Sequence, residues 1–519
     1  MHPAFPACIL QHRNSLTPKE MMIRWLILLW MTLTYTYAFA QQAPRSPREL
    51  RKQIEAILQE EPFQNAFWGI VVYDLHANKT LYTHNPEKSF IPASNLKLYT
   101  TAAALDILKP SFQYKTPVYV YTDSTATGLK HHLIVRGSGD PTIGGRFTNG
   151  DRTRTFRDWA DSLKAAGIHL LEGDVVGDDD IFDDIPLGYG WSWDDETYWY
   201  SAELGGLVFN DNCVDFTIVG LRRGTPALVS WEPFNTDYVR VINATLTLPP
   251  DSSLTEGYTR ERGSNTIYLS SRIPEGRIDF ESLTVHNPTL YFAHILRSTL
   301  IYAGIPVFGL PVDVDDLPIK PDYSQPAYRK IATHYSPPLR EIVKVINKRS
   351  QNLYADQLLK TLGAVAYPDS LPGAGSHARG IAVAMQVFAR AGIDTSRIQM
   401  VDGSGLSRMN LVTPEMTVKL LRYMWQHPDT TIRNAFYESL PIGGIDGTLE
   451  KRFRQGKAYT NVRAKTGYVS NARTLSGYVH TARGTPLAFS IMCNHYTIPT
   501  KLVNQAQDRI VELLARYRR

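Results

Sequence analysis

The chain has 519 residues, more than one hydrophobic core usually supports, so two or three domains are expected. Hydrophobic residues make up 43% and charged residues 20%, which is typical of a globular protein and excludes a largely disordered chain. The net charge of +5 is mildly basic, but no block of Lys and Arg stands out in the body of the chain, so nucleic-acid binding is not supported.

Residues 1–40 are predicted to be an N-terminal extension and a signal peptide. Arg24 precedes an apolar run, residues 25–37, and residues 38–40 have the Ala-x-Ala pattern of a cleavage site. A membrane anchor is the alternative, but the run is shorter than the ~20 residues that a membrane span needs. We therefore expect a protein secreted across the cytoplasmic membrane of a bacterium, into the periplasm, with at most peripheral membrane contact through the basic residues 516–519.

Residues 41–112 are predicted to be the first half of a mixed domain. Helical spacing covers residues 49–59, and two strands, residues 67–74 and 80–83, are joined by a turn. A helix then begins near Ser94. Its apolar residues indicate that it is buried in the core of the domain.

Residues 113–318 change in character and are predicted to be an inserted module of two subdomains. Residues 118–121 and 133–136 resemble strands, and residues 155–166 resemble an amphipathic helix. From residue 207 to about residue 312, short strand-like runs alternate with turn clusters, so this stretch is expected to be rich in β-structure.

Residues 319–519 are predicted to be the second half of the interrupted domain. Helical patterns run from residue 339 to residue 423, and strand-like runs follow at 462–465, 474–480 and 487–493 before a final amphipathic helix. The predicted fold class is therefore α/β (α+β): an antiparallel sheet flanked by helices, interrupted by a large β-rich insertion.

The chemistry is predicted to centre on Ser94 and Lys97. Positions three apart lie on one face of a helix, so the Lys97 amine can reach the Ser94 hydroxyl. A serine needs a base to take its proton as it attacks a carbonyl, and a lysine serves only where burial or a second cation lowers its pKa. Taken alone, the pair fits a solvated helix face better than a catalytic site.

Two further motifs follow. Ser350 and Asn352 lie where a helical pattern breaks and resumes; the hydroxyl can relay a proton and the amide can hold a substrate carbonyl, or the serine simply caps a helix. Lys465, Thr466 and Gly467 end a strand. There the lysine attracts a carboxylate and the glycine lets a substrate approach the backbone; an exposed strand with a polar end is the alternative.

The ordered set Ser-x-x-Lys, Ser-x-Asn and Lys-Thr-Gly resembles that of penicillin-binding proteins and class A β-lactamases. The gap between Ser94 and Ser350 is far wider than in a compact β-lactamase. It resembles the D-alanyl-D-alanine carboxypeptidase/endopeptidase type of low-molecular-mass penicillin-binding protein (class C, peptidase family S13), which carries a large module between these motifs. Further stretches support the likeness: residues 137–142, 190–195, 402–408 and 446–449.

This resemblance implies a serine peptidase that cleaves peptidoglycan stem peptides through an acylated Ser94 and is acylated by β-lactams as covalent inhibitors. Lys97 would be the general base. Ser350 and Asn352 would assist proton relay and substrate binding. No cofactor or metal is implied, and the alternatives are a serine β-lactamase and a catalytically silent cell-wall-binding protein.

The resemblance also implies binding roles. Lys465 and Thr466 would engage the terminal carboxylate of the substrate, with Gly467 beside them, and the backbone N–H groups of Ser94 and Tyr468 would form the oxyanion hole. Many relatives have Ser or Thr where this chain has Tyr468, which leaves the balance of carboxypeptidase and endopeptidase action open.

The loop of residues 191–195 resembles a segment of the inserted module that, in relatives, reaches towards the diamino-acid side chain of the stem peptide. Trp191 and Asp194 are the candidates there, and the acidic Asp194 would suit an ammonium group.

Overall fold

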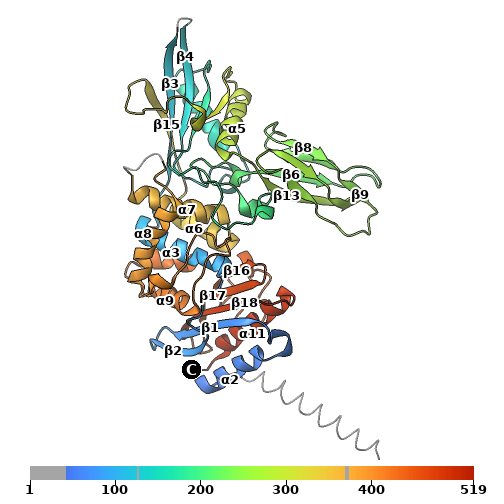
Figure 1. The fold of residues 1–519 in the computed structure, drawn as a ribbon, viewed down its shortest axis with the longest axis vertical. Coiled ribbons are helices and arrows are strands. Elements are labelled where there is room, and N and C mark those ends of the chain that lie inside the picture. Colours follow the sequence, from blue (N-terminus) through green and yellow to red (C-terminus); the bar gives the residue numbers. More distant parts are fainter. Residues whose placement is uncertain (1–42, 126–127, 369–372, 519) are drawn as a thin grey trace, which may run out of the picture.

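The computed structural model describes residues 43–125, 128–368 and 373–518. The predicted extension and signal peptide lie outside these residues. Within them, no helix combines the length and the apolar character that crossing a membrane requires. Figure 1 shows an elongated molecule in which one domain, containing the C-terminal end, carries a module of two lobes.

An antiparallel sheet with the strand order β16-β17-β18-β1-β2 forms the base of the domain. Because β1 pairs with β18, the first and last parts of the chain meet in one sheet. The strands are β1 (Phe67–Asp74), β2 (Lys79–His84), β16 (Arg463–Val469), β17 (Ala472–His480) and β18 (Pro486–Asn494).

Successive side chains of β1 point to opposite faces of the sheet, and each face is covered by its own set of helices. Ile70 and Val72 pack with α2 (Pro47–Leu58) and α11 (Thr500–Arg516). Val71 and Tyr73 pack on the other face with the helical layer that contains the buried α3 (Leu96–Leu108). The other helices of that layer are α6 (Leu339–Lys344), α7 (Asn352–Ala366), α8 (His377–Arg390), α9 (Pro414–Trp425) and α10 (Thr430–Ser439). The predicted fold class is confirmed.

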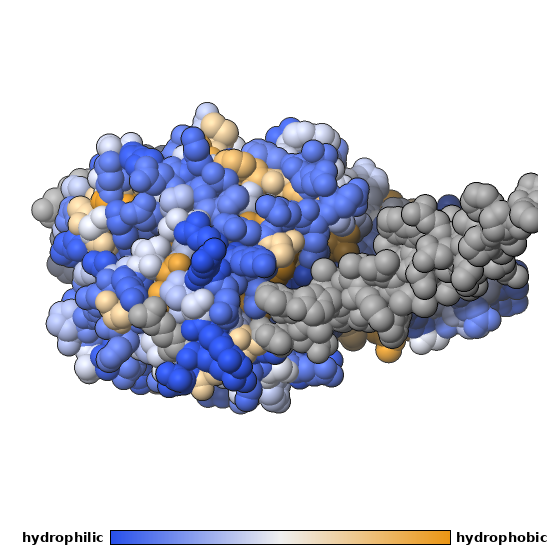
Figure 2. All heavy atoms as spheres, turned by 90° about the horizontal axis from the view of Figure 1, so that it is seen from below, coloured by the Kyte–Doolittle hydropathy of each residue, from blue (hydrophilic) through white to orange (hydrophobic). Residues whose placement is uncertain are grey.

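The end of the domain away from the module is seen in Figure 2. The coloured part of this face is mostly hydrophilic, and hydrophobic side chains are scattered over it in small groups. Such groups are ordinary on a protein surface.

The first lobe of the module is a sheet with the strand order β14-β5-β4-β3-β15. Its strands are β3 (Lys115–Thr125), β4 (Gly128–Arg136), β5 (Val175–Asp178), β14 (Pro311–Asp313) and β15 (Tyr328–Tyr335), and α4 (Arg154–Ala165) and α5 (Pro288–Tyr302) pack with it. β15 lies beyond residue 318, the predicted end of the insertion, and yet it pairs with β3. We therefore propose that the module ends after Tyr335.

The second lobe is rich in short strands, as predicted. It contains β6 (Cys213–Val219), β7 (Leu228–Glu232), β8 (Arg240–Asn243), β9 (Leu246–Leu248), β10 (Tyr258–Arg260), β11 (Thr266–Leu269), β12 (Arg272–Pro274) and β13 (Ile278–Thr284). The stretch 207–312 nevertheless contains α5, which was not predicted. Most residues of this helix are apolar and buried, so its amphipathic period is weak; its local signals are the Asn287 cap and Pro288 in the first turn.

Candidate active site

Ser94 lies on a short 3₁₀ helix, η2 (Ala93–Asn95), at the start of α3. The preceding Ala93 has a φ of 46°, in the left-handed region that costs energy for a residue with a side chain. Gly405 packs against this strained turn, because a Cβ atom there would lie 2.0 Å from the Ala93 carbonyl oxygen. The contact with Gly405 thus holds the turn in place. Within residues 90–106, which are otherwise buried, Ser94 is the one partly exposed residue.

Lys97 is the centre of a hydrogen-bond cluster. Its Nζ atom donates to Ser94 Oγ at 2.9 Å, to Asn352 Oδ1 at 2.6 Å and to the Ser404 carbonyl oxygen at 2.7 Å. The last two partners only accept, while the Ser94 hydroxyl can also donate. A neutral Lys97 amine can therefore keep its N–H groups on Asn352 and Ser404 and turn its lone pair to the Ser94 proton.

Burial lowers the pKa of Lys97 from its usual range to about 7. Desolvation disfavours the charged ammonium, and the side chain is fully enclosed. The carboxylates of Asp356 and Asp402 act in the opposite direction and keep the lowering moderate. About half of the lysine is then neutral at pH 7, which suits a general base.

The loop that follows Asp402 positions the Ser404 carbonyl. Asp402 accepts hydrogen bonds from the backbone N–H of Gly405 at 2.8 Å and of Ser407 at 2.7 Å. Trp191 of the inserted module donates a third, from Nε1, at 3.0 Å. Trp191 therefore contacts the loop whose Ser404 carbonyl positions Lys97. This contact was not predicted from the sequence.

Asp356 is a further residue that was not predicted. Its Oδ1 atom accepts a hydrogen bond of 2.6 Å from the N–H of Gly403 and fixes the start of the same loop. It lies four residues after Asn352 on α7, so both side chains share a helix face. The four-residue spacing between Asn352 and Asp356 was the one sequence signal that could have pointed to Asp356.

Ser350 lies at a break between a π-helix, η8 (Val345–Arg349), and α7, as the interrupted helical pattern predicted. Its φ of 62° is left-handed, and its hydroxyl accepts a hydrogen bond of 2.8 Å from Lys465 Nζ. Asn352 Nδ2 donates to the Tyr200 carbonyl of the module at 2.7 Å. This contact fixes the amide so that its oxygen faces Lys97.

β16 is an edge strand that docks on η2. Asn95 Nδ2 donates to the Lys465 carbonyl at 2.8 Å, and Thr474 Oγ1 donates to the Pro92 carbonyl at 2.7 Å. A Cβ atom on Gly467 would lie 2.6 Å from the Pro92 oxygen, so a larger residue would push β16 away from the turn. These contacts hold the Lys465 end of β16 beside the turn that carries Ser94.

Lys465 is a buried cation without a carboxylate among its described contacts. Its Nζ atom donates to Ser350 Oγ and to the Thr466 carbonyl, each at 2.8 Å. Burial, and then the charges of Lys97 and Arg473, hold the pKa of Lys465 well below its usual range. A carboxylate bound here would supply the missing countercharge.

The remaining predicted residues differ in exposure. Thr466 is buried, and its hydroxyl donates a hydrogen bond of 2.8 Å to Thr448 Oγ1. The Tyr468 side chain is 54% exposed and lies beside the Arg473 guanidinium. Asp194 is exposed on η4 (Trp193–Asp195) and accepts a hydrogen bond from Ser192; no described contact joins it to Ser94 or Lys97.

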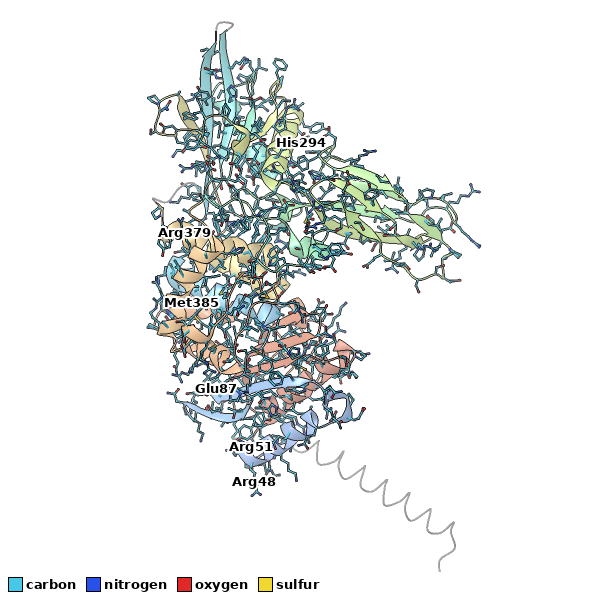
Figure 3. All side chains as sticks on the ribbon, viewed as in Figure 1. Arg48, Arg51, Glu87, His294, Arg379 and Met385 are labelled. Atoms are coloured by element: carbon cyan, nitrogen blue, oxygen red, sulfur yellow. The ribbon has the colours of Figure 1, made fainter. Side chains whose placement is uncertain are left out.

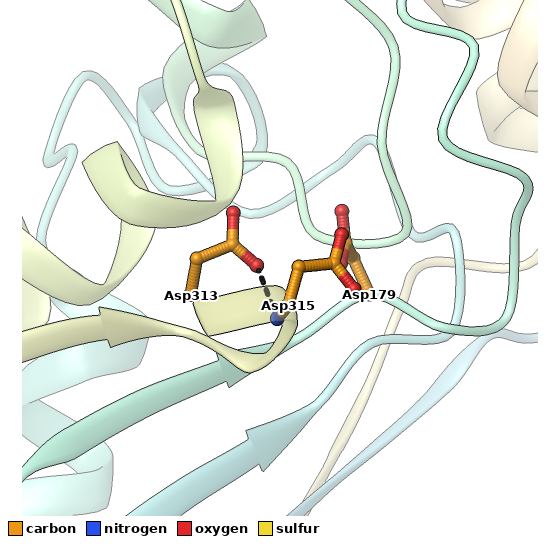
Figure 4. A group of neighbouring side chains, drawn as sticks. All are labelled: Asp179, Asp313 and Asp315. Atoms are coloured by element: carbon orange, nitrogen blue, oxygen red, sulfur yellow. Dashed lines mark hydrogen bonds between the residues drawn. The ribbon is translucent and has the colours of Figure 1, made fainter. Parts of the chain in front are cut away.

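A separate group of carboxylates lies in the first lobe of the module. The carboxylate oxygens of Asp179, Asp313 and Asp315 lie within 4.8 Å of one another, and Asp313 accepts a hydrogen bond from the Asp315 N–H (Figure 4). Burial and the neighbouring carboxylates raise the pKa of Asp179 to about 7. Protonation of Asp179 would remove one of these neighbouring charges, so the group is expected to affect stability.

Comparison with known proteins identifies the family and the fold. The chain matches the D-Ala-D-Ala carboxypeptidase 3 (S13) family over residues 50–517. A D-alanyl-D-alanine carboxypeptidase from an Actinomadura species is 31% identical over 509 residues, 94% of this chain and 89% of the relative. Another from Haemophilus influenzae is 27% identical over 439 residues, 83% of this chain and 85% of the relative. The crystal structure of penicillin binding protein 4 from Haemophilus influenzae covers 89% of this chain and 99% of its own, with a TM-score of 0.76 at 24% identity, so the fold is shared.

Proposed function

Because the chain belongs to the D-Ala-D-Ala carboxypeptidase 3 (S13) family, as the order of its motifs predicted, we propose that it removes the terminal D-alanine of peptidoglycan stem peptides with Ser94 as the nucleophile. The observation that carries this assignment is the hydrogen-bond set of Lys97. Two acceptor-only partners leave Ser94 as the one partner that can give Lys97 a proton.

In the acylation step, the Ser94 Oγ–carbon bond forms as the Ser94 proton passes to Lys97 Nζ. The C–N bond to the terminal D-alanine then breaks, and its amine takes up the proton that Lys97 received, relayed by the Ser350 hydroxyl, so that Lys97 is neutral again. Water then attacks the acyl ester as Lys97 takes its proton; the ester C–O bond breaks, the proton returns to Ser94 Oγ, and the shortened peptide is released.

Substrate binding in this proposal uses β16. The terminal carboxylate lies at Lys465 and Thr466, where it supplies a countercharge to the buried ammonium. The carbonyl oxygen is held by the backbone N–H groups of Ser94 and Tyr468, with Gly467 leaving room for the peptide. Asn352 holds a substrate amide, and Trp191 and Asp194 lie on the side of the diamino acid, where Asp194 offers a negative charge to an ammonium group.

The protein would act outside the cytoplasmic membrane, in the periplasm, after removal of the predicted signal peptide. The cell-wall substrate of the family supports this location, because stem peptides ending in D-alanyl-D-alanine lie in the wall. β-Lactams would acylate Ser94 in place of the substrate.

The test is digestion of purified disaccharide-pentapeptide, followed by mass spectrometry. Wild-type protein should remove one D-alanine, and Ser94→Ala should remove none. Rapid turnover of penicillin with an intact pentapeptide would favour a β-lactamase, and binding of cell walls without any product would favour a silent binding protein.

A further inference from the structure

A cavity lined by arginines lies at the end of the domain away from the module (Figure 1). Its wall is formed by Arg45, Arg483 and Arg518, with Ser46 and Pro47 at the start of α2, and we call it the arginine cavity. Its volume of about 430 Å³ falls within the range of about 300–1,000 Å³ that is usual for small-ligand sites. None of the residues that line it belongs to the candidate active site.

The fold holds the three arginines together. They come from three segments that are distant in the chain: the residues before α2, the turn between β17 and β18, and the C-terminal end. The backbone N–H of Arg518 donates to the Pro44 carbonyl at 3.0 Å, and the N–H of Ala482 donates to the Tyr517 carbonyl at 3.0 Å. The C-terminal segment is thus bonded to both of the others, so backbone contacts bring the three guanidinium groups to one cavity.

The charges of this cavity are not balanced. All three arginines are exposed, and among the described residues no carboxylate lies within ion-pair distance of their side chains. Glu49 accepts a hydrogen bond of 2.8 Å from the Arg45 backbone N–H but does not line the cavity. Glu512, near the C-terminal end, accepts the backbone N–H groups of residues 457–458 instead. Positive charge is therefore in excess, and an anion bound between the arginines would relieve their repulsion.

The chemistry of the arginines favours a phosphate group. The planar guanidinium group can donate two parallel hydrogen bonds to the oxygens of one phosphate, which makes arginine a preferred phosphate ligand. Such a phosphate could be a free ion or part of the head group of an anionic phospholipid.

The position of the cavity along the chain favours the lipid. The apolar run of the predicted signal peptide ends at Tyr37, and Arg45 follows it by eight positions. An extended chain of that length spans at most about 29 Å, so in the unprocessed chain the cavity lies close to the membrane that this run enters. Arg48 is a further exposed cation, and it projects from α2 at the same end of the molecule (Figure 3).

We propose that the arginine cavity binds the phosphate of an anionic phospholipid and holds the protein on the membrane surface. The phosphate oxygens accept hydrogen bonds from the three guanidinium groups, and Arg48 lies against neighbouring head groups. Because the module is at the opposite end of the molecule, it then points away from the membrane. The sequence predicted peripheral contact through residues 516–519; the proposal adds the segment before α2 and the turn between β17 and β18.

The test is co-sedimentation of residues 41–519, the predicted mature chain, with phosphatidylcholine vesicles that contain about 30% phosphatidylglycerol. Omitting residues 1–40 prevents binding through the apolar run. Wild-type protein should bind these vesicles and should not bind phosphatidylcholine alone. The triple variant Arg45→Gln, Arg483→Gln and Arg518→Gln should bind at least about 20-fold more weakly, because each arginine near an anionic surface contributes about 5-fold.

The control is a triple variant with the same change in net charge: Arg222→Gln, Arg223→Gln and Arg277→Gln. These arginines are exposed on the second lobe of the module, and among the described residues they have no carboxylate within ion-pair distance. This variant should bind within about 2-fold of wild type. An equal loss in both triple variants would overturn the site, because it would mean that net charge alone decides binding.

Two further measurements separate the lipid from other anions. Raising the salt concentration from about 50 mM to about 500 mM should release wild-type protein from the vesicles, and binding that does not depend on salt would contradict the proposal. Titration with inorganic phosphate in a calorimeter tests the free ion. Wild-type protein that bound inorganic phosphate but not the anionic vesicles would overturn the lipid as the ligand. None of these measurements requires Ser94, so their failure would leave the proposed function standing.

Discussion

Trp191 Nε1 donates a hydrogen bond of 3.0 Å to Asp402 Oδ2, and this contact joins the inserted module to the loop that holds Lys97. The module is thus part of the support of the catalytic cluster. Trp191→Phe keeps most of the packing and removes the donor from a buried carboxylate, which we expect to slow acylation by a labelled penicillin by about 3- to 10-fold. The measurement is the second-order rate constant of labelling.

Trp193→Phe is the control for this change. Trp193 lies two residues away and is 68% exposed, so its replacement should leave the labelling rate within about 2-fold of wild type. Equal rates for the two variants would contradict a positioning role of Trp191.

Gly405→Ala should abolish most activity. The new Cβ would lie 2.0 Å from the Ala93 carbonyl oxygen, at a backbone φ of +81° that disfavours side chains, and the turn carrying Ser94 would have to move. A displacement of this size costs about 100-fold in rate. Gly392→Ala is the matched control, because its φ is +74° but nothing lies within 4 Å of the added atom. It should cost about 1 kcal/mol in unfolding free energy and little activity; similar rates for the two would be inconsistent with the packing described.

Acylation of Ser94 should rise with pH through about 7. Lys97 must be neutral to take the Ser94 proton, and burial places its pKa at about 7, so the reactive fraction grows from pH 6 to pH 8 and then levels off. The rate of labelling by penicillin across this range gives the profile. A rate that stayed constant from pH 5.5 to 8.5 would exclude Lys97 as the base.

Asp179→Asn should stabilise the protein at pH 8 but not at pH 4. The folded-state pKa of Asp179 is raised to about 7 from 3.8, so the folded state favours the protonated form. Below pH 4 the carboxyl is protonated in both the folded and the unfolded state, so it does not lower the unfolding free energy. The loss of unfolding free energy grows as the pH rises above 4 and is complete above pH 7, where the buried carboxyl is ionised. We expect a gain in unfolding free energy of about 1–3 kcal/mol at pH 8. Asp251→Asn, at an exposed position, is the control, and an equal shift in Tm at both pH values would refute this account.

The sequence predicted the parts of the site that depend on local spacing. Ser94 and Lys97 lie within one helical turn, and their hydrogen bond follows from that period. The strands of the sheet were also predictable, because they are short apolar runs bounded by turn residues. The predicted family and the class of activity are confirmed by the match over residues 50–517.

The rest depended on contacts between distant segments. Asp356 gains its role only because a loop from residues 402–405 folds over α7, and no periodicity in the sequence encodes that packing. β15 was placed outside the module because its partner, β3, lies about two hundred residues earlier in the chain. α5 was missed because most of its residues are apolar and buried, so that its amphipathic period is weak.

The most direct test of the central claim is intact-mass spectrometry with peptide mapping after exposure to penicillin at pH 8. Wild-type protein should gain the mass of one penicillin on Ser94, Ser94→Ala should gain none, and Lys97→Arg should gain it at least about 100-fold more slowly. An adduct on another residue, or an adduct that persists in Ser94→Ala, would contradict the assignment of Ser94 as the nucleophile that Lys97 activates.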